Sequence, residues 1–185
     1  MLQVFVFSGL FLFSSWGLAT ANSPFYQIDM IVFTHLQLPS SMESSESTLL
    51  APDTTNAIPL VNTASNAKTP YHALPPSASQ LRDEYWALNR KPQYQILFRY
   101  TWLQPANNQR PIALSQINAG GWNVEGTLTI KQSNYYLIDT KLLFSAPNSK
   151  QSAFIFSQKQ RLKPNVVYYL DHPRAGMLLK IHPIT

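Results

Sequence analysis

Four consecutive residues near the end of the chain, Asp171-His172-Pro173-Arg174, combine an acid, an imidazole and a guanidinium. Such groups can transfer protons or bind anions. Asp171 and His172 are adjacent, however, and adjacent residues of an extended chain point to opposite faces, so they do not act as a pair. The chain also lacks the motifs of serine hydrolases, zinc peptidases, phosphate-binding loops and dinucleotide sites. We therefore predict no catalytic residue and no cofactor, and we expect that the protein is not an enzyme.

The same run has the features of a corner between two apolar segments, 166–170 and 177–182. Pro173 suits the second position of a turn because its ring fixes φ. Asp171 can accept hydrogen bonds from turn N–H groups, and Gly176 can take a positive φ. We predict a structural role for Tyr169, Asp171, Pro173 and Gly176. His172 and Arg174 remain candidate ligand contacts, because binding groups often lie on loops that a scaffold holds in place.

Three basic residues alternate in a neighbouring segment: Lys159, Arg161 and Lys163. On a strand this spacing places them in one row. Two interpretations stay open. The row protects an edge strand from self-association, or it forms a stripe that binds anions.

Metal binding is not expected. The chain has no cysteine, which excludes thiolate ligands and a thiol nucleophile. Its four histidines are spread along the sequence, and two of them, His35 and His72, flank a segment without strong structural signals. We predict no metal site.

The segments that must position these groups are mostly strands. Apolar and polar residues alternate almost without fault in 122–131, with Trp122, Val124, Leu128 and Ile130 on one face. In 94–103, Ile96, Phe98, Tyr100 and Trp102 share a face by the same rule. Other strand candidates are 26–33, 135–144, 153–162, 166–170 and 177–182.

A helix is predicted over 78–89, where Leu81, Tyr85 and Leu88 form an apolar stripe and Ser77 with Gln80 matches a capping box. Residues 34–78 are rich in Ser, Thr, Asn, Ala and Pro, and we interpret them as a low-complexity, flexible excursion that touches the domain at Leu49-Leu50 and at Ile58–Val61. The fold class is α+β, mostly β. We expect a curved antiparallel sheet of about six or seven strands with one packed helix.

The first residues of the chain have the pattern of a signal peptide. An apolar run from Val4 to Leu18 contains no charged residue and precedes Ala19-Thr20-Ala21. We predict cleavage after Ala21, which leaves residues 22–185 as a single mature domain without stable membrane insertion. Retention of residues 1–21 as a membrane anchor is the alternative.

Charge is unevenly distributed along the mature chain. Residues 22–89 contain two basic and six acidic residues, whereas residues 90–185 contain twelve basic and three acidic residues. A basic C-terminal half favours an anionic partner. For an exported protein we expect carboxylate-rich cell-wall peptides, anionic lipid or an acidic protein face rather than nucleic acid.

The C-terminal residues 156–184 resemble the end of the CsiV family of exported peptidoglycan-binding, cell-shape proteins of Gram-negative bacteria. The resemblance is carried by Tyr169-Leu170-Asp171-His172-Pro173, Gly176, Ile181 and Pro183. The segments 26–33, 100–105 and 126–130 agree with the family in the same order. Val166 and Tyr168 stand where family members carry a Glu-x-His pair.

This resemblance implies a non-catalytic periplasmic protein that binds peptidoglycan and supports cell-wall synthesis and cell shape. Its implied partners are peptidoglycan and an outer-membrane lipoprotein that activates a peptidoglycan synthase. The alternative is a periplasmic protein-interaction adaptor that recruits a partner through a sheet edge or the 34–78 segment without contacting glycan.

The signal-peptide interpretation predicts that the mature protein begins at Asn22. N-terminal sequencing or intact mass of the protein recovered from a periplasmic fraction checks this. Membrane-bound protein that retains Met1 would contradict it.

Overall fold

A computed structural model describes residues 25–36, 49–63, 68–146 and 153–184. The predicted signal peptide, residues 1–21, lies outside these ranges. The described residues form nine strands and two short helices, and the mostly β class is confirmed. The elements are β1 (Phe25–His35), β2 (Ile58–Pro59), the 3-10 helix η1 (Pro76–Ala78), α1 (Arg82–Asn89), β3 (Tyr94–Pro105), β4 (Ile112–Ala119), β5 (Trp122–Gln132), β6 (Tyr136–Ser145), β7 (Phe154–Leu162), β8 (Val167–His172) and β9 (Ala175–Ile184).

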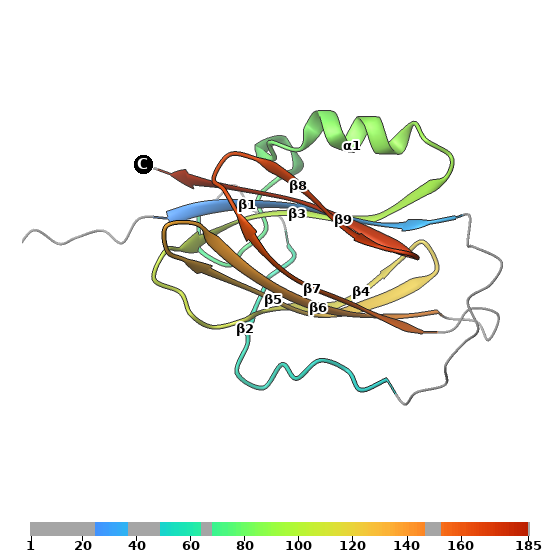
Figure 1. Cartoon of the computed structure of the whole chain (residues 1–185), viewed down its shortest axis with the longest axis horizontal. Coiled ribbons are helices and arrows are strands. Elements are labelled where there is room, and N and C mark those ends of the chain that lie inside the picture. The colour runs from blue at the N-terminus through green and yellow to red at the C-terminus, as the bar shows by residue number, and fades with distance from the viewer. Residues whose placement is uncertain (1–24, 37–48, 64–67, 147–152, 185) are drawn as a thin grey trace, which may run out of the picture.

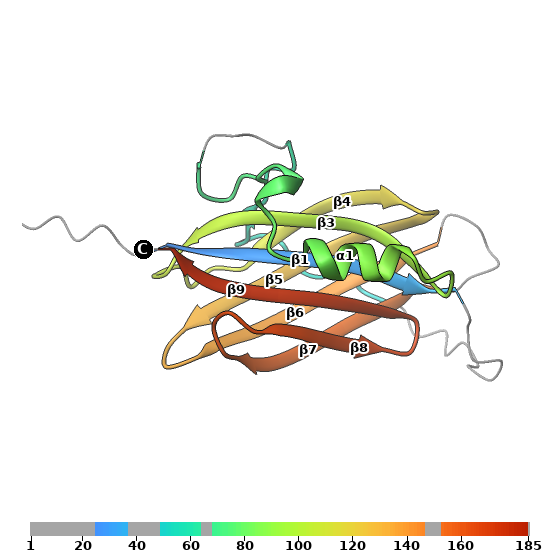
Figure 2. The ribbon, with the colours of Figure 1, turned by 90° about the horizontal axis from the view of Figure 1, so that it is seen from above.

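The strands divide between two sheets instead of the single curved sheet that we expected. One sheet has the order β3-β1-β9-β8 and the other β2-β4-β5-β6-β7. Neighbouring strands are antiparallel apart from β2 and β4, which run parallel. The two sheets pack face to face, and α1 lies on the outer face of the four-stranded sheet (Figure 1). Seen from above, α1 lies over β1, between β3 and β9, and runs roughly along the strand (Figure 2).

β1 is buried along almost its whole length because both of its faces are covered. Ile28, Met30 and Val32 point into the main core between the sheets. Ile31 and Phe33 point the other way and pack with Leu81 beside α1. A strand covered on both faces reads as a continuous apolar run, and residues 26–33 have that pattern.

β3 carries an irregularity that its sequence does not reveal. The register against β1 shifts between Val32 and Phe33, which face Phe98 and Ile96. Leu97 is the additional residue, and it joins the main core with Phe98, while Ile96 packs on the helix side. The prediction that Ile96 shares a face with Phe98 was therefore wrong, because an extra residue in one strand reverses the faces beyond it.

α1 begins at Arg82, four residues later than predicted, and no side chain caps it. The expected capping box of Ser77 and Gln80 does not form. Instead Gln27 Nε2 donates a hydrogen bond to the carbonyl oxygen of Ala78 at 2.9 Å, and Gln80 Nε2 lies 3.1 Å from His182 Nε2. These tertiary contacts hold residues 78–80 against the sheet and outweigh the local helical preference.

The antiparallel pair of β5 and β6 follows the sequence closely. Trp122, Val124, Leu128 and Ile130 are buried in the main core, as the alternation predicted. Gly126 lies on the same inward face with φ +151, and a Cβ built there would lie 2.1 Å from the carbonyl oxygen of Lys141. The missing side chain thus lets β6 approach β5 at this point.

Part of the 34–78 segment contacts the domain where we expected it. Ile58–Pro59 pairs with β4, and Leu60 is buried in the main core. Val61 pairs with His72, and Ala73 pairs with Trp102. Leu50 is largely exposed, and residues 37–48 and 64–67 lie outside the described residues. The flexibility of this segment stays a prediction. No helix in the described parts of the chain is long and apolar enough to cross a membrane.

Two glycine substitutions test how closely β5 and β6 approach. We expect Gly126→Ala to destabilise the protein by about 3 kcal/mol, because the new methyl group overlaps the Lys141 carbonyl. Gly121→Ala is the matched control, since φ is +80 there but no atom lies within 4 Å of the new Cβ. Its loss should be only about 1 kcal/mol. Equal shifts of the two variants in a thermal melt would contradict the close approach.

Candidate functional site

The structure separates the predicted ligand-binding residues into two places. Lys159 and Arg161 are exposed on β7, the edge strand of the five-stranded sheet, and Lys163 follows that strand. His172 and Arg174 belong to the tight turn that joins β8 to β9. The five residues therefore do not form one site.

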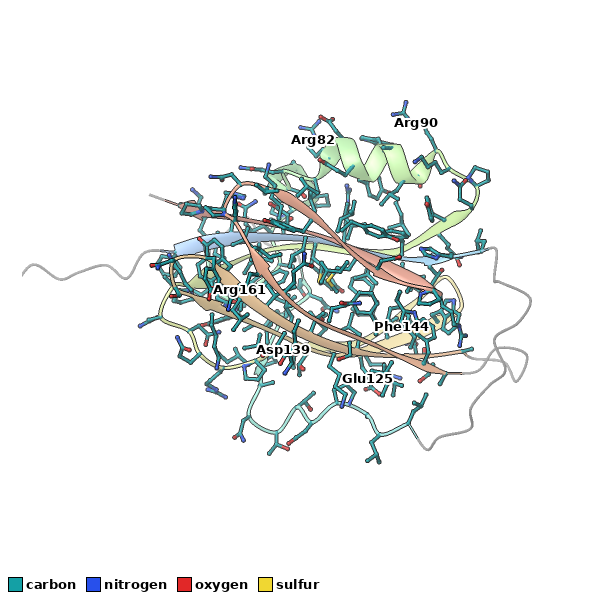
Figure 3. The ribbon with its side chains drawn as sticks, viewed as in Figure 1. Arg82, Arg90, Glu125, Asp139, Phe144 and Arg161 are labelled. Carbon is teal, nitrogen blue, oxygen red and sulfur yellow. The ribbon has the colours of Figure 1, made fainter. Side chains whose placement is uncertain are left out.

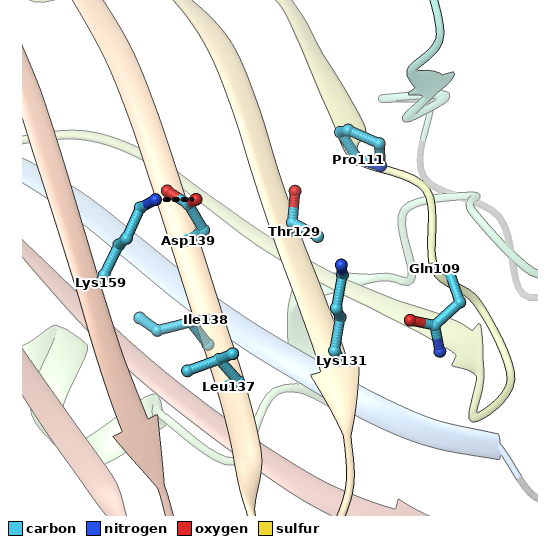
Figure 4. Close-up of a pocket in the computed structure, with 8 residues that line it drawn as sticks. All are labelled: Gln109, Pro111, Thr129, Lys131, Leu137, Ile138, Asp139 and Lys159. Carbon is cyan, nitrogen blue, oxygen red and sulfur yellow. Dashed lines mark ion pairs between the residues drawn. The ribbon is translucent and has the colours of Figure 1, made fainter.

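A shallow groove lies on the outer face of the five-stranded sheet (Figure 4). Its volume is about 390 Å³. We call it the basic groove, and its lining residues are Gln109, Pro111, Thr129, Lys131, Leu137, Ile138, Asp139 and Lys159. Lys131 ends the outward row of β5, so the regular alternation of that strand places its ammonium group at the groove.

The groove combines charge with an exposed apolar residue. Lys159 Nζ lies 3.0 Å from Asp139 Oδ2, but both side chains are largely exposed, so this pair adds little stability and can exchange its partners. The described residues place no ion-pair partner on Lys131. Leu137 is 43% exposed beside these charges. The groove can therefore bind a carboxylate and a short alkyl group together.

The other two basic residues of the row make different contacts. The Arg161 guanidinium lies 4.7 Å from the centroid of the Tyr135 ring, a cation–π geometry. The Lys163 backbone N–H donates to the Tyr168 hydroxyl at 2.9 Å. β7 is an edge strand, as the protection interpretation requires. Anion binding by the row stays a prediction.

The turn between β8 and β9 is tighter than predicted. His172 pairs with Ala175, which leaves only Pro173 and Arg174 in the turn. Pro173 thus occupies the second turn position, as we expected. The residue that accepts the turn N–H is different: the Arg174 N–H donates to His172 Nδ1 at 3.2 Å, not to Asp171. His172 is therefore part of the turn structure.

The expected role of Gly176 also needs correction. Gly176 does not have the positive φ that we proposed. A Cβ on this residue would lie 2.4 Å from the Phe33 ring and 2.7 Å from the Tyr169 ring. The glycine is required by the close approach of two aromatic rings, not by the turn.

One side of the turn faces the space between the sheets. The His172 ring stacks on Phe154 at 4.8 Å, and the Arg174 guanidinium lies 4.3 Å from the Phe154 centroid and 5.6 Å from that of Trp122. We call these four residues the inner cluster. Burial, and next the charge of Arg174, lowers the pKa of His172, so the imidazole favours its neutral form.

The other side of the turn holds a second group, the outer cluster of His35, Tyr94, Tyr169 and Asp171. The Tyr169 hydroxyl donates to Asp171 Oδ1 at 2.5 Å and lies 3.5 Å from His35 Nε2. His35 Nδ1 lies 3.2 Å from the Pro173 carbonyl oxygen. Sequence reasoning missed His35 because it placed this residue outside the strand, whereas β1 continues to His35 and pairs it with Tyr94.

A buried acid on β1 was also missed. Asp29 is fully buried and accepts hydrogen bonds from Thr101 Oγ1 at 2.7 Å and from Gln27 Nε2 at 3.2 Å. His182 Nδ1 lies 3.6 Å from its other oxygen, and burial lowers the pKa of His182 more than Asp29 raises it. Asp29 within the apolar run 26–33 is the sequence feature from which this network could have been predicted. It lies under residues 78–80 and away from solvent, so we assign it a structural role.

No group of three potential metal ligands occurs among the described residues.

Comparison with known proteins gives one result for the chain. The model of a protein family described as "Peptidoglycan-binding protein, CsiV" matches residues 3–184. The chain therefore belongs to the CsiV family, as its C-terminal motif indicated. No curated protein and no solved structure matches the chain.

The lowered pKa values of His172 and His182 predict a pH-dependent stability. Because the unfolded chain binds protons more readily than either folded imidazole, stability present above about pH 6.5 is lost as the pH falls. We expect the melting temperature to drop between about pH 7.5 and about pH 5, and to drop less in His172→Gln, which keeps an acceptor for the turn.

His72→Gln, which removes an imidazole outside the turn, is the matched control for this measurement. An equal loss of pH dependence in both variants would show that burial of His172 is not its cause.

Proposed function

We propose that this member of the CsiV family binds peptidoglycan in the periplasm, as a non-catalytic protein that supports cell-wall synthesis and cell shape. Family membership supports peptidoglycan as the ligand. The observation that carries the proposal further is the basic groove, which places Lys131 and Lys159 beside the exposed Leu137. We assign the stem peptides of peptidoglycan to this groove.

The chemistry of stem peptides fits the lining of the groove. Such peptides carry free carboxylates, short alkyl side chains and amide groups. A carboxylate can pair with Lys131 directly or take the place of Asp139 on Lys159, since the exposed pair is weak. Leu137 offers apolar contact, and Thr129 and Gln109 can bond to amides. Contacts of this kind weaken with salt.

The proposed partner, beyond the polymer itself, is an outer-membrane lipoprotein that activates a peptidoglycan synthase. Binding of the wall polymer would hold the chain where such an activator works. α1 provides a surface for a protein that is separate from the basic groove, so polymer and protein need not compete.

A second candidate function is a protein-interaction adaptor without glycan contact. Trp86 is 53% exposed on α1 and lines a concavity with Asp83 and Arg90. Trp and Arg are enriched at the energetic centres of protein interfaces. α1 and the basic groove lie on opposite sides of the molecule: Arg82 and Arg90 point outward from α1, and Asp139 lies on the far sheet (Figure 3).

This separation allows a test by co-sedimentation with insoluble peptidoglycan. We expect Lys131→Gln/Lys159→Gln to weaken binding about three- to tenfold, because two salt-dependent contacts are lost, and to flatten the salt dependence. Arg82→Gln/Arg90→Gln removes two charges from the opposite face and should bind like the wild type. Arg161→Gln/Lys163→Gln shows separately whether the rest of the row contributes.

The outcomes of this experiment test the basic groove and peptidoglycan binding separately. Unchanged binding of the Lys131/Lys159 variant would remove the groove from the proposal. A wild-type protein that does not sediment at all would contradict peptidoglycan binding and favour the adaptor function.

A further inference from the structure

We propose that Tyr169, Asp171 and His35 form a second binding site, for a pyranose ring of a glycan strand. The site lies on the outer face of the four-stranded sheet, beside the β8–β9 turn. Its biological ligand rests on the proposed function, because the glycan of peptidoglycan is the polysaccharide that such a protein would meet. Binding of the sugar is testable by itself.

The Tyr169 ring is held in a fixed orientation and offers a flat aromatic surface, which we call the platform. One face of its ring stacks on Phe33, with centroids 6.0 Å apart and an interplanar angle of 13°. The ring can lie this close to the sheet only because residue 176 is a glycine, since a Cβ there would overlap both rings. The residue is nevertheless 47% exposed. The sheet therefore supports one face of the ring, and the other face is available to a ligand.

The edge of the platform carries hydrogen-bond acceptors in fixed positions. His35 Nδ1 faces the Pro173 carbonyl, which can only accept, so Nδ1 carries the proton and Nε2 is left as an acceptor. The Tyr169 hydroxyl donates its single proton to Asp171 Oδ1. Among the described residues, no hydrogen-bond donor contacts Asp171 Oδ2. Asp171 Oδ2 and His35 Nε2 can therefore accept from a ligand.

A pyranose ring matches this arrangement. It presents an apolar face of C–H groups that can lie on an aromatic ring, and hydroxyl or amide N–H donors at its rim. Sites for such molecules combine aromatic surface with a few well-placed polar groups. An anionic peptide fits less well, because the Asp171 carboxylate would repel it. The two sites thus differ in the part of the polymer that they bind: the platform takes sugar and the basic groove takes carboxylate.

A neutral oligosaccharide separates the two sites. We would titrate the full mature chain with the β-1,4-linked tetramer of N-acetylglucosamine, which has no peptide and no charge, and measure affinity by calorimetry. The wild type should bind, and Tyr169→Ala should lose about tenfold or more in affinity because the stacking surface is gone. Trp86→Ala, which removes an exposed ring on α1, should bind like the wild type.

Two further variants keep the experiment decisive if Tyr169→Ala unfolds. Asp171→Asn and Tyr169→Phe preserve the packing on Phe33 but change the hydrogen bonding at the rim. Asp171→Asn should weaken binding, because an amide replaces one acceptor by a donor. Tyr169→Phe should retain stacking and hence most of the affinity. Tetramer binding that none of the Tyr169 and Asp171 variants weakens would overturn the proposal.

The basic-groove variant separates this proposal from the proposed function. Lys131→Gln/Lys159→Gln should bind the tetramer like the wild type while losing affinity for intact peptidoglycan. A wild type that sediments with peptidoglycan but does not bind the tetramer overturns the platform and leaves the function intact. A wild type that binds neither overturns both.

Discussion

Pairing of β1 on both sides is the constraint on which the rest of the structure depends. β1 lies between β3 and β9, which come from the middle and the end of the chain, so the four-stranded sheet exists only if the first strand of the described chain joins them. Burial of both faces of β1 provides the driving force, because its apolar side chains leave water on either side. The same pairing places Thr34 opposite Ala175 and His35 opposite Tyr94. The outer cluster is thus a consequence of β1 register.

Burial on both faces also explains the polar network beneath η1. Asp29 is on the face that residues 78–81 cover, so its carboxylate must be satisfied inside the protein. Thr101 and Gln27 supply the hydrogen bonds, and Gln27 then donates to Ala78 as well. This network holds Ala78 in η1 through its carbonyl, Ser79 beyond it is extended, and α1 begins only after these residues. A buried acid on one strand therefore sets where a helix starts about fifty residues away, through contacts that no local pattern contains.

The sequence predicted best those elements that have one buried face. β5 alternates strictly because one side packs in the core and the other faces outward, so the period of two appears in its residues; β6 follows the same pattern up to Leu142, after which Leu143 is buried as well. β1 was predicted as a strand but ended two residues too early, and the sequence did not distinguish its two faces because both are buried. The extra residue of β3, Leu97, could not be recognised in the sequence, because Ile96, Leu97 and Phe98 are all apolar. Of the candidate sites, the sequence indicated the charged edge strand and the turn. It did not indicate the contact of His35 with Tyr169 or the place of Lys131 in the basic groove, because both depend on neighbours distant in the chain.

On one side of the molecule, β7 and β8 lie at the edges of the two sheets. The same side chains protect these edges and provide the candidate binding groups. β7 and β8 are edge strands, one from each sheet, and edge strands expose backbone groups that invite aggregation. Here Gln158 on β7 donates to the Asp171 carbonyl on β8 at 2.7 Å, and the Tyr168 hydroxyl accepts from the Lys163 N–H. Lys159 is out of phase with Phe156 and Leu162 of β7, which point into the core, and Tyr169 precedes the buried Leu170 on β8, so each projects from an edge strand to the outside. Under the proposed function, a long polymer that passes along this side would meet charge on one sheet and an aromatic ring on the other. The proposed polymer contacts thus use side chains that face outward from the sheets, such as Lys131, Lys159 and Tyr169, so binding leaves the core between the sheets undisturbed.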